Sequence, residues 1–173
     1  MTAIRLAQVV VALACLACGP AGVADQATAP PQPRAAPAPG AASELHRVRQ
    51  VIDGDTLTVS GIGTVRLIGV DAPEKQGGYR EAEPYGDQAT AFLKRMAEGR
   101  LVRLEYDGER KDRYNRTLAY VFLEDGTLVN EAIIREGWAE FYRSFDYRRK
   151  KAFQEAEREA RGARRGIWAR TKR

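Results

Sequence analysis

The stretch that decides the fold is "LHRVRQVIDGDTLTVSGIGTVRLIGV", residues 45–70. Apolar and polar residues roughly alternate along three runs within it: 45–52, 56–60 and 64–70. This alternation is typical of half-buried β-strands. The runs are separated by "DGD" (53–55) and "GIG" (61–63), and Asp and Gly are favoured in turns. The stretch therefore predicts a three-stranded antiparallel meander.

The residues after the meander predict three helices and two further strands. The segment "YGDQATAFLKRMAEG" (85–99) has apolar residues at helical spacing and stops on a glycine. Two strand-like runs and two helical runs follow: 100–107 and 117–123, then 128–137 and about 146–161. Five short strands with a helix after the third fit a small closed barrel. We predict an α+β fold, a five-stranded OB-fold β-barrel with three α-helices.

The first 43 residues differ in composition from this domain. Residues 1–24 combine one arginine, a short apolar run and a small-residue exit, which predicts a secretory signal peptide rather than a short buried helix. Residues 25–43 are rich in proline and alanine and predict a disordered linker. We place the OB-fold domain at 44–170 and a basic tail at 171–173, and we expect export to the periplasm or the extracellular space.

Both cysteines, Cys15 and Cys18, lie inside the predicted leader. Each follows a small residue, so lipid attachment to the membrane at either one is a minor alternative to cleavage, although neither has leucine three positions earlier. Cleavage after residue 24 would leave a chain without cysteine, which excludes disulfides, zinc–thiolate sites and thiol nucleophiles. The single histidine, His46, excludes a paired-histidine phosphodiesterase and a histidine-rich zinc site.

Carboxylates occur in two groups that the meander should bring together. Asp53 and Asp55 occupy the first turn, and Asp71 and Glu74 follow the third strand. Each group alone could be ordinary turn chemistry. The start of the second strand and the end of the third share one end of the sheet, so we expect Asp55 near Asp71. Two close carboxylates repel unless a cation or a proton lies between them, and oxygen ligands favour Ca²⁺ or Mg²⁺ over zinc.

Two arginines extend this arrangement. Arg66 lies in the third strand, and Arg116 ends the charged loop before the fifth strand. Each alone could be an ordinary surface residue. A guanidinium, however, presents a planar set of donors that matches phosphate oxygens. A metal ion, a carboxylate base such as Glu74 and two arginines are what phosphodiester hydrolysis requires.

The sequence resembles the staphylococcal nuclease (thermonuclease) family across about residues 46–169. The resemblance rests on six motifs in order: "VIDGDT", "VRLIGVDAPE", "EPYGDQA", "DRYNRTLAYVF", "LVNEAIIREGWA" and "GIW". It implies an OB-fold barrel and a Ca²⁺-dependent nuclease that cleaves the bond to the 5′ oxygen of DNA and RNA and leaves 3′-phosphate ends. We expect single-stranded substrates to be favoured and the protein to be a monomer.

The resemblance also implies roles for individual residues. These are Asp55 and Asp71 as metal ligands, Ala72 as a ligand through its backbone carbonyl, Asp53 as a supporting acid, Glu74 as general base, Arg66 and Arg116 as phosphate-binding residues, and Arg113 and Tyr114 as contacts to nucleotide phosphates. The chain departs from the family pattern at Ala72, where threonine is familiar, and at Arg143 and Phe145, where tyrosines lie near the nucleotide. An aromatic ring at 145 still permits base stacking.

A second hypothesis is a catalytically weak OB-fold module that binds nucleic acid without cleaving it. Such a module would be expected to have lost at least one of the five residues that carry the chemistry. All five are present in this chain: Asp55, Arg66, Asp71, Glu74 and Arg116. The sequence therefore favours the enzyme over the binding module.

Overall fold

Five strands close into a barrel in the order β1-β2-β3-β6-β5. They are β1 (His46–Val51), β2 (Thr56–Val59), β3 (Gly63–Leu67), β5 (Leu101–Glu105) and β6 (Thr117–Leu123). Neighbouring strands are antiparallel except β3 and β6, which run parallel. This computed structural model describes residues 44–77 and 81–170, all within one compact unit. The predicted five-stranded barrel is confirmed.

Alternation along the strands sets which side chains fill the barrel. In β3, Val65 and Leu67 are buried, and Arg66 between them projects to the other face. Leu57 and Val59 of β2 are also buried in the same hydrophobic core. The apolar residues that suggested strands in the sequence are therefore the interior of the barrel.

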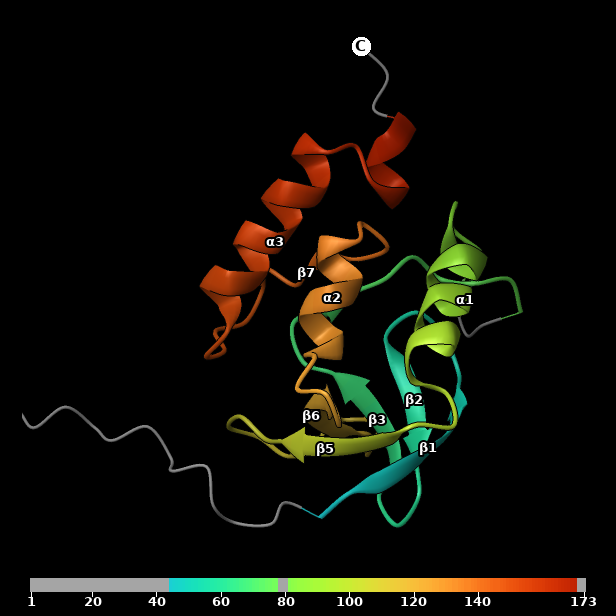
Figure 1. Ribbon diagram of the computed structural model, residues 1–173, viewed down its shortest axis with the longest axis vertical. Helices are drawn as coiled ribbons and strands as arrows, with labels where there is room; N and C mark the ends of the chain where they lie inside the picture. Colours follow the sequence, from blue (N-terminus) through green and yellow to red (C-terminus); the bar gives the residue numbers. More distant parts are fainter. Residues whose placement is uncertain (1–43, 78–80, 171–173) are drawn as a thin grey trace, which may run out of the picture. The chain divides into compact units, whose positions relative to one another are not determined.

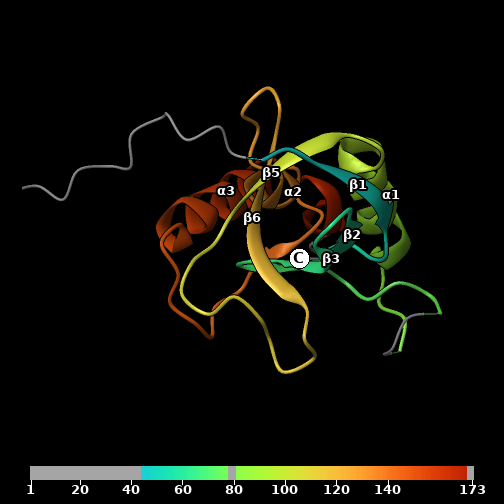
Figure 2. The same ribbon diagram turned by 90° about the horizontal axis from the view of Figure 1, so that it is seen from below.

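Three α-helices lie together on one side of the barrel, above it in Figure 1 and behind it when seen from below in Figure 2. They are α1 (Gly86–Ala97), α2 (Val129–Arg135) and α3 (Lys150–Gly162), and a 3-10 helix, η1 (Gly166–Arg170), follows. Leu93 of α1, Ile133 and Ile134 of α2, and Phe153 of α3 are fully buried. The helices therefore bury their apolar faces in the same core as the strands.

The predicted third strand, 64–70, is wrong at its end. β3 stops at Leu67, and the chain turns at Gly69, whose φ is 75°. An L side chain rarely adopts that backbone conformation, and a Cβ there would lie 2.6 Å from the Tyr147 ring. A new two-residue strand, β4 (Val70–Asp71), then pairs with β7 (Glu140–Phe141), which the sequence did not predict. Asp71 therefore lies on a separate small sheet.

The last helix also begins later than predicted, at Lys150 rather than near residue 146. The residues before it are held by side-chain contacts instead: the Tyr147 hydroxyl donates to the carbonyl of Tyr142 at 3.1 Å, and the Arg148 amide donates to the Asp107 carboxylate at 2.7 Å. The 3-10 helix η1 was not predicted. It is held by a contact that is distant in sequence, since the Ile167 amide donates to the Gly137 carbonyl at 2.8 Å.

The predicted leader, linker and tail lie outside the described residues, as do Cys15 and Cys18. Among residues 44–77 and 81–170, no helix combines the length and the apolar character needed to cross a bilayer.

Candidate active site

The turn between β1 and β2 carries Asp55, which is only 8% exposed. Its amide donates to the Asp53 carboxylate at 3.1 Å, so Asp53 shapes the turn that presents Asp55. The carbonyl of Asp55 accepts the Leu67 amide at 2.9 Å, and its Oδ2 accepts the Ala72 amide at 3.2 Å. The Asp55 turn therefore contacts the second acidic segment at the peptide that joins Asp71 to Ala72, and the predicted approach of the Asp55 and Asp71 carboxylates stays a prediction.

Arg66 forms an ion pair with Asp55 through Nη1 and Oδ2. The Nη1 atom of Arg66 is buried and faces the Asp55 carboxylate. Burial raises the pKa of Asp55 to about 7, against the lowering effect of the Arg66 guanidinium and with a further rise from the neighbouring Asp53. Asp55 is thus a desolvated carboxylate that gains from a nearby positive charge.

Small residues bring the acidic turn against the segment that follows β4. A Cβ on Gly54 would lie 2.6 Å from the Ala72 methyl and 3.0 Å from the Ala89 methyl of α1. Real Cβ atoms do not approach so closely, so only glycine allows this packing. Ala72, one of the departures from the family pattern, is therefore part of the contact that fixes Asp55.

Glu74 follows Pro73 and is partly buried. Its amide donates to the carboxylate of Glu83 at 3.1 Å, and its carbonyl accepts the amide of Glu83 at 2.9 Å. Sequence reasoning missed Glu83, although it lies in the quoted motif "EPYGDQA". The motif was informative, but nothing in it indicated which acid pairs with which amide.

Arg116 lies just before β6, on the same outer face of the barrel as Arg66. Arg66 pairs with Leu118 across the parallel β3–β6 ladder, and residues two apart in a strand share a face. Asp112 holds Arg116 in two places: Nε donates to Oδ2 at 2.7 Å, and the amide donates to Oδ1 at 2.9 Å. Burial raises the pKa of Asp112, but these hydrogen bonds outweigh it and leave the pKa below its usual value. Asp112 was also missed by sequence reasoning.

Arg113 and Tyr114 lie in the same loop as Arg116. The Arg113 Nη2 donates to the Tyr114 hydroxyl at 2.7 Å, and the guanidinium of Arg116 lies 5.4 Å from the centre of the Tyr114 ring. Tyr114 is 63% exposed, which is unusual for an aromatic ring of this size. The structure thus groups the exposed Arg113 and Tyr114 with the half-buried Arg116.

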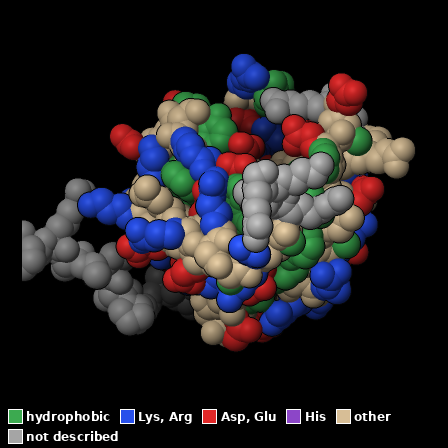
Figure 3. All heavy atoms as spheres, turned by 90° about the horizontal axis from the view of Figure 1, so that it is seen from above, with side chains coloured by type: hydrophobic (Ala, Val, Ile, Leu, Met, Phe, Trp, Pro, Cys, Tyr) green, Lys and Arg blue, Asp and Glu red, His purple; other side chains and the backbone are tan. Residues whose placement is uncertain are grey.

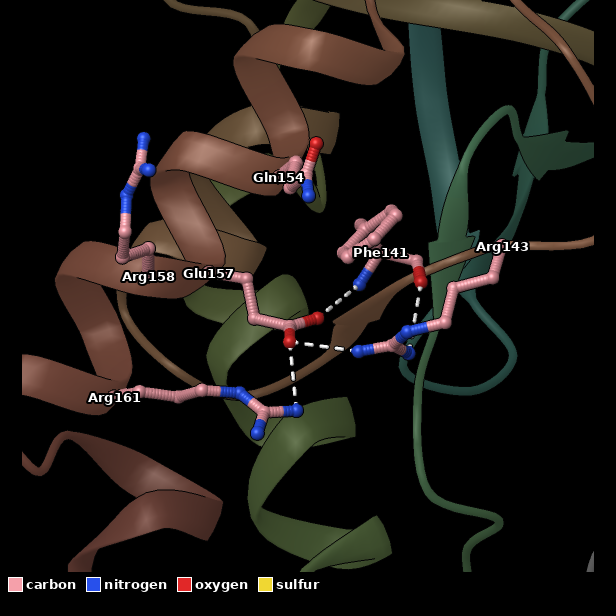
Figure 4. A pocket seen from close by; sticks show the side chains of 6 residues that line it. All are labelled: Phe141, Arg143, Gln154, Glu157, Arg158 and Arg161. Atoms are coloured by element: carbon pink, nitrogen blue, oxygen red, sulfur yellow. Dashed lines mark hydrogen bonds and ion pairs between the residues drawn. The ribbon is translucent and has the colours of Figure 1, made fainter.

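Arg143 lies in an ion-pair network rather than projecting alone from the surface (Figure 4). Glu157 of α3, whose side chain is only 5% exposed, accepts hydrogen bonds from the Phe141 amide at 2.9 Å and from Arg143 Nη2 at 2.8 Å, and pairs with Arg161 at 2.7 Å. Arg143 Nη1 also bonds Glu140 at 2.8 Å. The guanidinium of Arg143 therefore already binds two carboxylates, those of Glu157 and Glu140. The expected contact of Arg143 with the substrate stays a prediction.

Phe145 is 66% exposed and lies beside Tyr142, with ring centres 5.4 Å apart. It follows β7 by four residues, and β7 pairs directly with the strand that carries Asp71. An exposed aromatic ring only four residues from the strand that pairs with the Asp71 strand fits the predicted role of Phe145 in base stacking.

The donor set suits a hard cation. Carboxylate oxygens of Asp55 and Asp71 and the carbonyl of Ala72 are the ligand types that Ca²⁺ and Mg²⁺ prefer. Among the described residues, no group of three or more His, Cys, Asp or Glu side chains is placed to hold a metal ion. A cation here would therefore take its remaining ligands from water or from a substrate phosphate, as an open catalytic site requires.

On the face seen in Figure 3, basic and acidic side chains are intermingled and do not form one broad basic patch. Many of the arginines in the described part of the chain are in ion pairs, including Arg135 with Glu159 and Arg149 with Glu105. The formal net charge of +5 over the whole chain is therefore not concentrated on this face.

The chain is similar in sequence to known nucleases. The family model described as "Staphylococcal nuclease homologue" matches residues 64–170. The chain is 40% identical over 131 residues to the thermonuclease of Staphylococcus hyicus, which covers 73% of this chain and 76% of that protein. It is 42% identical over 132 residues to the thermonuclease of Staphylococcus intermedius, covering 73% and 77%. It is 35% identical over 128 residues to endonuclease YncB of Bacillus subtilis, covering 70% and 60%.

The closed barrel with three helices and the match to the family model together define a class of protein that cleaves phosphodiester bonds. The chain belongs to the staphylococcal nuclease family. It is a nuclease, a hydrolase that acts on phosphodiester bonds.

Proposed function

We propose that this protein is an exported, Ca²⁺-dependent nuclease that hydrolyses DNA and RNA at the bond to the 5′ oxygen and leaves 3′-phosphate ends. The single observation that carries the proposal is the position of Asp55. It is buried, paired with Arg66, and hydrogen-bonded to the amide of Ala72 beside Asp71. One carboxylate thus links the candidate metal ligands to a candidate phosphate-binding residue.

The residues that would hold the cation are Asp55 and Asp71 through their carboxylates and Ala72 through its carbonyl. When bound, Ca²⁺ would polarise the phosphate and favour ionisation of a bound water. The raised pKa of Asp55 supports this assignment, because a buried carboxylate is stabilised in its charged form by a cation next to it. Asp53 contributes by holding the turn in the conformation that presents Asp55.

The remaining groups act on water and on the phosphate. Glu74 takes a proton from the attacking water as general base. Arg66 and Arg116 bind the phosphate oxygens and stabilise the charge that grows on them in the transition state. Because Asp112 holds the Nε of Arg116, the Nη groups of that guanidinium are the donors for a phosphate.

Substrate contacts away from the reacting phosphate are assigned to Arg113, Tyr114 and Phe145, with Arg143 nearby. The exposed rings of Tyr114 and Phe145 suit unpaired bases, since stacking on an aromatic face is independent of sequence. We therefore propose single-stranded DNA and RNA as the favoured substrates. We also propose a monomer as the active form. The predicted leader supports export.

One assay tests the proposal. Purified protein is incubated with single-stranded DNA in millimolar Ca²⁺, with and without EGTA, and the product ends are analysed for 3′-phosphate. We expect cleavage that EGTA abolishes and that returned Ca²⁺ restores. Binding of the DNA without any cleavage would identify the protein as the catalytically weak binding module instead. Cleavage that persists in EGTA would exclude the Ca²⁺-dependent mechanism.

A further inference from the structure

The first turn of α1 contacts both acidic segments of the site. Ala89 packs against Gly54 in the Asp55 turn. Gly86 packs against the backbone of Glu74 so closely that a Cβ would overlap the Glu74 carbonyl and lie 2.7 Å from the amide nitrogen of Lys75. The beginning of α1 is therefore the surface on which the two segments are held relative to each other.

The backbone of Glu74 needs this support, because Pro73 before it has no amide hydrogen. The Ala72 amide is already bonded to Asp55. The next amide that can fix the segment is that of Glu74, and it donates to the side chain of Glu83. The Glu83 amide returns a hydrogen bond to the Glu74 carbonyl, and the Glu83 carbonyl accepts the amide of Gly86 at 3.2 Å.

We propose that Glu83 is a positioning residue for the general base. Its carboxylate fixes the Glu74 backbone at the beginning of α1 and thereby sets the distance from the Glu74 carboxylate to the attacking water. A hydrogen bond from an amide to a carboxylate is among the stronger ones, and it is the only one of the three that depends on a side chain. This inference rests on the proposed role of Glu74 as general base.

The consequence for catalysis follows from geometry. A displacement of about 1 Å at a reacting group can cost about a hundred-fold in rate. Glu83→Ala removes the acceptor and should lower kcat by about ten- to a hundred-fold, with KM and Ca²⁺ affinity within about two-fold of the wild type. The separation of kcat from KM is expected because Asp55, Asp71 and the arginines keep their own contacts.

Three further variants separate positioning from charge and from folding. Glu83→Gln keeps an acceptor oxygen at the same reach and should retain kcat within about three-fold of the wild type. Glu83→Asp keeps the charge but shortens the side chain by one methylene, and it should behave like Glu83→Ala. Glu81→Ala removes an exposed carboxylate two residues away and is the matched control, with kcat unchanged. All are measured on the full folded domain, whose integrity is checked by circular dichroism.

A double-mutant cycle with Glu74→Gln gives the decisive readout. If Glu83 acts through Glu74, adding Glu83→Ala to Glu74→Gln should cost little further activity. Full multiplication of the two losses would overturn the positioning role, and so would equal damage from Glu83→Gln and Glu83→Ala. Failure of the proposed function looks different: there, Glu74→Gln itself would leave kcat unchanged whatever the state of Glu83.

Discussion

Gly86→Ala tests whether the beginning of α1 is packed as tightly against Glu74 as the structure indicates. In an ordinary helix, replacing glycine by alanine stabilises the protein by up to about 1 kcal/mol, because alanine loses less backbone entropy on folding. Here the added methyl would overlap the carbonyl of Glu74, and all three nearest atoms are backbone atoms that cannot rotate away. Because of this contact, Gly86→Ala should destabilise the protein instead of stabilising it.

The size of the effect follows from two opposing contributions. Overpacking a tight contact costs about 1–3 kcal/mol, and rigid backbone neighbours place Gly86 at the upper end. Subtracting the helix-propensity gain leaves a net loss of about 2 kcal/mol in the free energy of unfolding. For a domain of this length, each kcal/mol lowers the melting temperature by about 4 °C, so a decrease of about 8 °C is expected.

The assay is thermal and urea unfolding of Gly86→Ala beside a matched control, Gly162→Ala. Gly162 is the last residue of α3, and a Cβ there would have no heavy atom within 4 Å. The control should be unchanged or stabilised by a few tenths of a kcal/mol. If Gly86→Ala were as stable as Gly162→Ala, the close packing of α1 on Glu74 would be refuted.

Two further predictions concern the anchors of the charged loops. Asp112→Asn should weaken the hydrogen bonds to Arg116 and raise KM for DNA several-fold. Steady-state kinetics should show that this variant retains more activity than Arg116→Ala. Equal losses of activity in the two variants would contradict the anchoring role of Asp112. Asp107 has a pKa below its ordinary value of 3.8, because hydrogen bonds from Arg148 and Tyr120 outweigh the effect of burial. Its stabilisation is therefore present above that value and lost as the pH falls through the lower folded-state pKa. Asp107→Asn should lower the free energy of unfolding at neutral pH by about 1–3 kcal/mol. The variant should also lose less stability than the wild type as the pH falls. If the free energies of unfolding of the two proteins fell in parallel with pH, this prediction would be contradicted.

Much of the fold could be predicted from the sequence because each barrel strand carries its own alternation. Val65 and Leu67 flank Arg66 with the period of a strand, and this local pattern survives in the structure. The β4–β7 pair could not be predicted, because two-residue strands have no period to detect. It forms only because Gly69 turns the chain toward a segment seventy residues away.

The candidate site, too, could be predicted only in part from the sequence. The meander predicted an approach of Asp55 to Asp71, but the structure brings Asp55 to the Asp71–Ala72 peptide through the turn at Gly69, beyond the end of β3. The partners Glu83 and Asp112 did not follow, because a carboxylate in a charged loop can bond many amides and the loop path decides which. The position of Arg143 depends on Glu157, which lies fourteen residues away on α3. The contact of Arg143 with Glu157 is set by tertiary packing, whereas Asp112 bonds the amides of Tyr114 and Arg116 within its own loop.

The strand that carries Asp71 has a consequence for the order in which the nuclease matures on the ribosome. The barrel strands are complete once Leu123 has been synthesised, but the β-partner of Asp71 is Glu140. The β7 strand is in turn held by the buried carboxylate of Glu157, through the Phe141 amide. A nascent chain therefore contains all the barrel strands well before it contains the residues that hold the Asp71 strand in place. Nuclease activity should therefore appear only after the chain has been synthesised beyond Glu157.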